Sequence, residues 1–244
     1  MLSYENKFIF VHVAKTAGSS VLEALLPYSN AKKTIGYGIS SGHWGISDPA
    51  TPTMHGKISE YQRHLGHSFD EYKIVAGFRD PFERLVSMYF SPHRWKKPSA
   101  LGRVSLKIES YTLRFKPISN GTLGRALDGI SPMVNVPPIW NEHKFVNLVE
   151  STPSHSDMLR RVDGLPLEEN GVIALRFGHL DFDFQRACIQ LGLPEDLSIQ
   201  TIGGGVGQRQ DLQKILKSKE LRHFTLTHFK EDLERYGKII EVGA

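Results

Sequence analysis

Three short apolar runs, each followed by a segment with apolar residues at helical spacing, organise the chain. Runs of this length and composition are typical of buried parallel strands. The predicted pairs are Phe8–Val13 with Ser19–Leu26, Lys73–Phe78 with a helix that begins after Asp80, and Val172–Phe177 with Asp181–Leu191. Because strands alternate with helices, the pattern predicts an α/β fold with a central, mostly parallel sheet flanked by helices.

The strongest helix start is the sequence Asp80-Pro81-Phe82-Glu83. It combines an Asp N-cap, a proline at the first helical position and a glutamate three residues after the cap. Further helices are expected at 59–65, at 142–150 and, as one closing amphipathic helix, at 220–236. Residues 28–54 show no clear period and predict a long connection, and the glycine-rich residues 201–210 predict a mobile loop.

Composition places the chain among ordinary globular proteins. Its 244 residues and mass of 27.5 kDa suit a single domain, 1–244. Residues 91–127 hold eight Lys or Arg residues and one acid, Glu109, within a variable insertion around 91–170. This basic segment is able to attract an acidic substrate or nucleic acid, and a solvated basic loop is an equally good interpretation.

The compartment is predicted from cysteine usage and from apolar runs. Cys188 is the only cysteine, which excludes an intrachain disulfide and any cysteine-cluster metal site. No apolar run approaches the roughly 18 residues of a membrane-spanning helix, and the first predicted strand, near residue 7, leaves no room for a signal peptide. We therefore expect a cytoplasmic protein that does not engage a membrane.

The first strand leads into a predicted anion cradle, the sequence AKTAGSS at 14–20. Gly18 permits a tight backbone path, and the free N–H groups that open the next helix, together with Lys15, face a phosphate or sulfate. The fingerprint of nucleotide triphosphatases places lysine after the second glycine, whereas here Lys15 precedes Gly18. Only Thr16 offers a weak match to the magnesium ligand, so a metal-dependent kinase is disfavoured.

A second anion signal follows the second strand. Arg79 leaves that strand at its carboxyl end, and Ser87 lies along the next helix. A guanidinium and a hydroxyl can together hold a second phosphate, well apart from the one at Lys15. The alternative is that Arg79 pairs with an acid and Ser87 is an ordinary helix residue.

Together, FVHVAKTAGSS and IVAGFRDPFERLVSMY resemble the motifs of sulfotransferases that use 3′-phosphoadenosine 5′-phosphosulfate (PAPS). The likeness is to the carbohydrate group with the heparan sulfate 2-O-sulfotransferases and their bacterial relatives. It implies a P-loop-like three-layer fold, with PAPS as donor and 3′-phosphoadenosine 5′-phosphate (PAP) as product. Arg79 and Ser87 are then expected to bind the 3′-phosphate. The residues implied for the 5′-phosphosulfate loop are Lys15, Thr16, Ala17, Gly18, Ser19 and Ser20.

Sulfuryl transfer by in-line displacement needs a base and charge stabilisation. Lys15 is suited to the charge that develops on the bridging oxygen. His55, in MHGKISEYQR, matches the first histidine of the family's H-G-H pattern, with Lys57 at the second position, and we expect it to be the base. His43 is the next candidate, and an ordinary solvent-facing histidine is the alternative.

The remaining expectations concern metals and partners. No metal is expected, because His64 and His67 lack a carboxylate partner on their short helix. The acceptor is expected to be a glycan or a small hydroxylated metabolite, anionic if the basic segment binds it, and not nucleic acid. Alternatives are a P-loop kinase or nucleotidase, and a non-enzymatic module that binds nucleotide or nucleic acid.

Overall fold

The computed structural model describes residues 1–35, 44–51, 54–91, 96–98, 133–135, 140–168, 171–200 and 210–242. The chain divides into two compact units. The first comprises 1–33, 46–89 and 140–244, and the second comprises 34–45 and 90–139. The first unit contains the central sheet and the helices around it. The predictions that fall on His43 and on most of the basic segment 91–127 lie outside the described residues.

The central sheet has four strands in the order β1-β2-β5-β8. The strands are β1 (Leu2–Ser3), β2 (Phe8–Val11), β5 (Lys73–Phe78) and β8 (Val172–Arg176). The edge strand β1 pairs antiparallel with β2, whereas β2, β5 and β8 run parallel, with Val11 opposite Ala76 and Ala76 opposite Ala174. The predicted mostly parallel sheet is confirmed. Because the three parallel strands are neighbours, their carboxyl ends lie side by side along one edge of the sheet.

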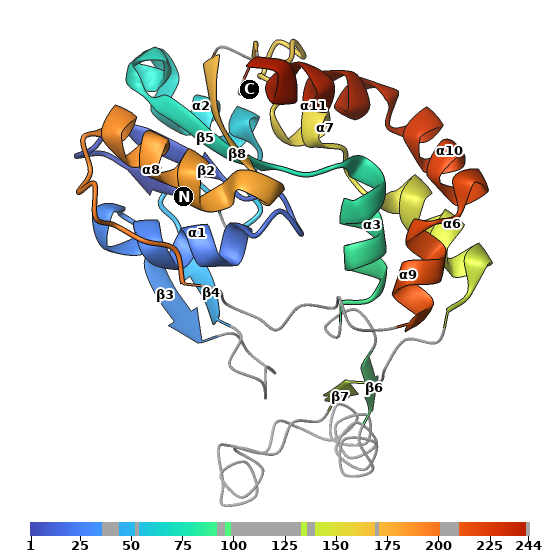
Figure 1. Cartoon of the computed structure of the whole chain (residues 1–244). Helices are drawn as coiled ribbons and strands as arrows, with labels where there is room; N and C mark the ends of the chain where they lie inside the picture. The colour runs from blue at the N-terminus through green and yellow to red at the C-terminus, as the bar shows by residue number, and fades with distance from the viewer. Residues whose placement is uncertain are drawn as a thin grey trace, which may run out of the picture. The chain divides into compact units, whose positions relative to one another are not determined.

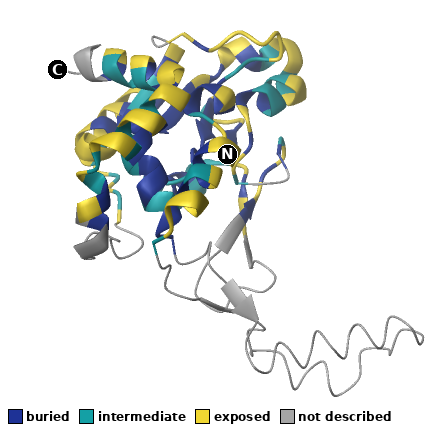
Figure 2. Ribbon diagram, turned by 90° about the vertical axis from the view of Figure 1, so that its right-hand side faces the viewer, coloured by how far each residue is buried: buried dark blue, intermediate teal, exposed yellow. Residues whose placement is uncertain are grey.

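Helices cover both faces of this sheet, which gives three layers. Helices α1 (Gly18–Leu25) and α8 (Leu180–Leu191) lie over one face, as Figure 1 shows. The other face packs against α2 (Ile58–Leu65), α7 (His155–Met158) and α11 (Lys230–Val242) in one apolar cluster. In Figure 2 the buried residues gather inside these layers and the exposed ones on the outer helix surfaces. The predicted three-layer α/β architecture is therefore confirmed.

A second group of helices packs around α3 (Pro81–Tyr89). The helices in contact with it are α6 (Glu142–Ser151), α9 (Gln210–Leu216) and α10 (Lys219–His228). Helix α3 starts as the sequence predicted, because the Asp80 carboxylate accepts a hydrogen bond from the Glu83 N–H at 3.0 Å. Its apolar face, with Phe82, Leu85 and Val86, is buried.

Short elements complete the described chain. They are the 3₁₀ helices η1 (Leu26–Tyr28), η2 (Gly66–Glu71) and η4 (Phe177–His179), and the strands β3 (Lys32–Ile35), β4 (Trp44–Ser47), β6 (Lys96–Pro98) and β7 (Met133–Asn135). β3 pairs with β4, and β6 pairs antiparallel with β7. The connection predicted at 28–54 thus contains two strands, β3 and β4, that the sequence did not predict. Each strand has only four residues, which is too short for a period to stand out in the sequence.

The closing helix also differs from its prediction, because it is two helices, α10 and α11, rather than one. The break is at Phe229, which leaves helical geometry with φ −106° and ψ 42°. Its ring is buried and lies 5.6 Å from the Arg84 guanidinium. The turn therefore places an aromatic ring in the interior where a continuous amphipathic helix would have run past it.

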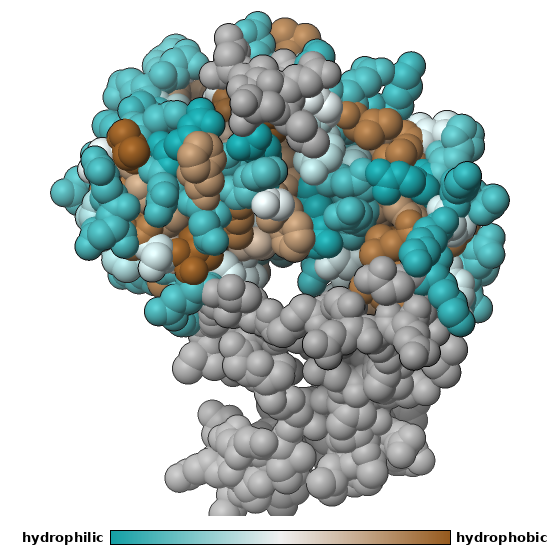
Figure 3. All heavy atoms as spheres, viewed as in Figure 1, coloured by the Kyte–Doolittle hydropathy of each residue, from teal (hydrophilic) through white to brown (hydrophobic). Residues whose placement is uncertain are grey.

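The described surface is mixed in polarity. In the view of Figure 3 hydrophobic residues are scattered among hydrophilic ones. Among the described residues, none of the helices combines the length and the apolar character that crossing a membrane requires.

Candidate anion-binding and transfer site

The loop between β2 and α1 has the backbone geometry of an anion cradle. Lys15 and Ala17 both adopt left-handed conformations, with φ 70° and φ 65°. No backbone N–H from Lys15 to Ser19 donates a hydrogen bond to an acceptor in the described part of the chain. Successive turn residues with unpaired N–H groups, next to a helix N-terminus, attract negative charge. The loop therefore offers five donors to an external anion.

Two glycines allow this loop to pack tightly. A Cβ added at Gly18 would lie 1.8 Å from Cδ2 of His12, so the His12 ring occupies the space that any side chain would need. A Cβ at Gly77 in β5 would lie 2.3 Å from Oγ1 of Thr16. The Thr16 hydroxyl is buried and donates to the Val13 carbonyl at 2.9 Å, so Thr16 presents its backbone N–H to a ligand.

Arg79 lies directly against the loop, because β2 and β5 are neighbours. Its Nη1 donates to the Lys15 carbonyl oxygen at 3.4 Å. Burial lowers the pKa of Lys15, and the nearby Arg79 charge lowers it further. Burial also lowers the pKa of the Arg79 guanidinium. Two half-buried cations that repel each other are stabilised by an anion placed between them.

Few protein groups compensate the Arg79 charge. Its Nε is 3.6 Å from a Glu83 carboxylate oxygen that is half exposed, and Nε makes no hydrogen bond within the described chain. The ring of Phe177 stacks 3.9 Å from the guanidinium carbon. Among the described residues, Glu83 is thus the acid that pairs with Arg79, as the alternative predicted, and the contact is loose and half exposed. Phe177, at the carboxyl end of β8, is a site neighbour that the sequence reasoning missed, since only the strand order brings it to Arg79.

Ser87 and the loop serines complete the predicted anion ligands. Ser87 lies half-buried on α3, one turn beyond Glu83, whereas Arg79 precedes the helix. Ser19 is half-buried in the first turn of α1, and Ser20 is buried there. The structure thus brings Arg79 against the loop, and Ser87 lies farther along the chain, within α3.

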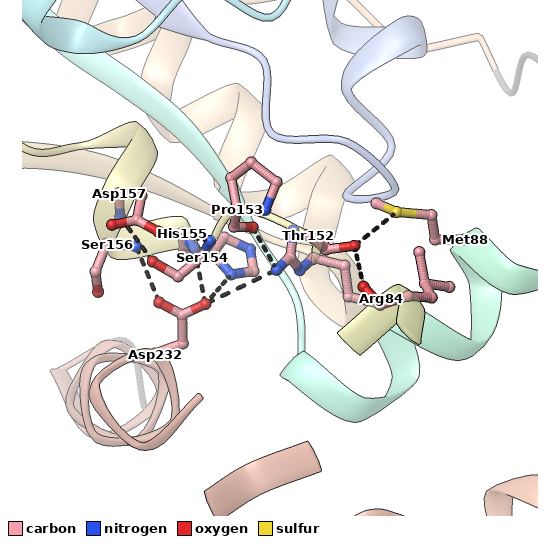
Figure 4. A network of polar contacts seen from close by, with 10 residues as sticks. Arg84, Met88, Thr152, Pro153, Ser154, His155, Ser156, Asp157 and Asp232 are labelled. Atoms are coloured by element: carbon pink, nitrogen blue, oxygen red, sulfur yellow. Dashed lines mark hydrogen bonds and ion pairs between the residues drawn. The ribbon is translucent and has the colours of Figure 1, made fainter. Parts of the chain in front are cut away.

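A buried polar network fixes α3 and thereby the position of Arg79. As Figure 4 shows, Arg84 of α3 donates to the Pro153 carbonyl at 3.0 Å and lies 3.9 Å from the Asp232 carboxylate of α11. Asp232 also accepts from the N–H groups of His155 and Ser156, at 2.7 and 2.9 Å, and from Nδ1 of His155 at 3.2 Å. Burial alone would raise the pKa of Asp232, but these hydrogen bonds lower it to about 2.

His55 lies beside the loop and has a defined tautomer. Its Nδ1 is 3.0 Å from the backbone carbonyl oxygen of His12, and the two imidazole rings are 4.5 Å apart. Since a carbonyl only accepts hydrogen bonds, Nδ1 carries the proton and Nε2 has the free lone pair. The His55 side chain is exposed. Its Nε2 is therefore able to take a proton from a group outside the protein.

His12 is the buried partner of this pair. It is a core residue, since only 4% of it is exposed. Its Nδ1 makes no hydrogen bond with described residues. Burial lowers the pKa of His12 well below the usual range, and the His55 and Lys15 charges add to this. His12 thus stays neutral while it supports both Gly18 and His55.

The described residues contain no group of three or more His, Cys, Asp or Glu side chains placed to hold a metal ion. The positive charges of Lys15 and Arg79 also make their surroundings unsuited to a cation.

Comparison with known proteins gives one family. Residues 1–108 match the model described as the sulfotransferase family. This supports a sulfotransferase. The matched residues include the loop after β2, His55, Arg79 and α3, which are the parts of the site described above. No curated protein and no solved structure matches the chain.

Proposed function

We propose that this protein is a PAPS-dependent sulfotransferase that transfers a sulfuryl group to a hydroxyl or amine of an acceptor. The observation that carries the proposal is that five successive N–H groups, from Lys15 to Ser19, have no acceptor among the described residues, with Arg79 against the same loop. Such a site demands an anion, and the family match at 1–108 selects sulfuryl transfer among the possible anion chemistries.

The residues present fit a donor with two anionic ends. The loop from Lys15 to Ser20 holds the 5′-phosphosulfate through backbone N–H groups and the Lys15 ammonium. Arg79 and Ser87 hold the 3′-phosphate, and the weakly compensated Arg79 guanidinium supports this assignment. The acid partner of Arg79 among the described residues is Glu83, whose carboxylate is 3.6 Å from Nε and half exposed, and an exposed ion pair of this kind contributes little stability.

The chemistry assigned to this chain is proton transfer and charge stabilisation. The donor supplies an activated sulfuryl group: the acceptor oxygen bonds to sulfur while the bond from sulfur to the bridging phosphate oxygen breaks. His55 takes the acceptor proton at Nε2, because Nδ1 is held by the His12 carbonyl. Lys15 and the loop N–H groups stabilise the charge on the bridging oxygen. His55 and Lys15 are therefore the proposed catalytic residues.

The likeness to the heparan sulfate 2-O-sulfotransferase group extends the proposal to the acceptor. We propose a carbohydrate or a small hydroxylated metabolite as acceptor, and the cytoplasm as the compartment. An acceptor screen with PAPS carrying radiolabelled sulfate identifies the product directly, and it includes anionic and neutral sugars because the basic segment favours the former.

A thermal-shift panel tests the donor. PAP without magnesium is expected to stabilise the chain, by about 2.7 kcal/mol at 100 times its Kd. For a protein of this size that raises Tm by roughly 5–10 °C. A response only to ATP with magnesium would reject the proposal in favour of a kinase. Binding of short RNA with steep salt dependence would instead support a nucleic-acid-binding module.

A further inference from the structure

Arg222 of α10 reaches the residue next to Arg79. Its Nη2 donates to Oδ2 of Asp80 at 2.7 Å, across 142 positions of sequence. The Asp80 side chain is only 10% exposed, and the Arg222 side chain is 42% exposed. The Arg222 guanidinium also lies 5.6 Å from the ring of Phe82. The pair therefore joins the C-terminal helices to the start of α3.

Asp80 caps α3, but its negative charge opposes the binding of an anion at Arg79. Its Oδ1 caps α3 by accepting from the Glu83 N–H, which sets the chain direction after Arg79. Its negative charge, however, lies next to the guanidinium that should bind an anion, and like charges in a poorly solvated site repel. Glu83 is half exposed and free to turn toward water, whereas the buried Asp80 is not. Asp80 therefore needs a counter-charge that does not come from Arg79.

We propose that Arg222 is a positioning residue for the anion site at Arg79. Arg222 neutralises Asp80 and holds its carboxylate in the capping position, so that Arg79 remains available to the ligand. This inference rests on the proposed function and adds to it a residue from α10, beyond the residues matched by the family model.

Calorimetric titration with PAP tests the inference in wild type, Arg222→Gln, Asp80→Asn and the double variant. Arg222→Gln is expected to weaken PAP binding about tenfold. The Asp80 carboxylate would no longer be neutralised, and it would repel the bound phosphate through a partly screened charge interaction. Asparagine caps helices as well as aspartate but carries no charge. The double variant is therefore expected to bind within about threefold of Asp80→Asn. Arg222→Lys, which keeps the charge, is expected to stay within about threefold of wild type.

Two further measurements separate this role from a purely structural one. The loss in Arg222→Gln is expected to shrink at 0.5 M salt, and to be absent for adenosine 5′-phosphate, which lacks the 3′-phosphate. The matched control is Arg160→Gln, which breaks the exposed pair with Glu231 at 3.0 Å and should leave PAP affinity unchanged. If wild type and Arg222→Gln bind PAP equally well, the inference about Arg222 is overturned, whereas the proposed function is not. The inference is also overturned if the double variant binds PAP as weakly as Arg222→Gln does. If wild type itself fails to bind PAP, the proposed function is overturned as well.

Discussion

Nδ1 of His55 lies 3.0 Å from the carbonyl oxygen of His12, and this contact determines which nitrogen of His55 is free. The carbonyl belongs to the residue whose ring packs on Gly18 at the start of α1. The base candidate and the anion loop are thus held by the same buried residue. Any shift of His12 is expected to move both together.

Replacement of His55 by alanine is expected to lower kcat by about 10²- to 10⁴-fold, the usual contribution of a general base. PAP affinity is expected to stay within about twofold, since His55 is assigned no donor contact. Steady-state kinetics and titration with PAP measure the two effects. The control is His67→Ala, at an exposed histidine on η2. Near-normal turnover of His55→Ala would exclude His55 as the base.

Gly18→Ala is expected to destabilise the fold by about 1–3 kcal/mol, as overpacking of a filled site does. The new Cβ would lie 1.8 Å from the buried His12 ring, so the ring or the loop would have to shift. PAP binding should fall as well, because the loop would have to shift. Urea unfolding provides the measurement, and Gly237→Ala, where a Cβ meets open space, should change stability by less than about 1 kcal/mol. Equal stability of the Gly18 variant and wild type would contradict the packing described.

Asp232→Asn is expected to cost about 3–5 kcal/mol, because it leaves the buried Arg84 charge without its carboxylate. Glu231→Gln is the matched control on the same helix, since it breaks only the exposed pair with Arg160 and should cost less than about 1 kcal/mol. Chemical denaturation compares the two variants. If both changes cost the same, the network around Arg84 does not hold α3 in place.

Stability is expected to fall as pH decreases below about 6.5, the ordinary histidine value. Burial lowers the pKa of both His12 and His155, so the unfolded chain binds protons in this window that the folded chain does not. Stability is thus fully present above about pH 6.5 and declines toward the lower folded-state pKa. Asp232 adds a later loss between about pH 4 and pH 2, because its folded pKa is about 2 and its unfolded pKa about 4.

His12→Phe tests this pH dependence, because it retains a ring and the backbone carbonyl but removes the titrating group. Urea unfolding at pH 7.5, 6.5 and 5.5 is expected to show a smaller loss of stability than in wild type. His67→Phe, at an exposed position, should leave the pH profile as it is. An unchanged profile in His12→Phe would mean that His12 does not remain neutral in the folded chain.

Local signals were sufficient for much of the fold. Strand β5 has the bounds predicted from its apolar run, and α3 begins at the predicted Asp80 cap, because apolar runs and capping residues act over a few neighbours. The two-residue strand β1 and the pair β3–β4 were missed, since strands so short or so polar leave no period to read. The break at Phe229 was missed because burial of its ring depends on Arg84, which is remote in sequence.

The sequence by itself determined the chemical inventory of this protein: a lysine and glycine loop after a strand, an arginine after a second strand, and a histidine between them. Their order in the chain and their local caps follow from short-range physics. Only the tertiary structure decided that Arg79 lies against Lys15, that the His12 carbonyl fixes the tautomer of His55, and that Arg222 neutralises Asp80. These contacts join residues that are remote in the sequence. They form because strand order and helix packing bring the residues close in space.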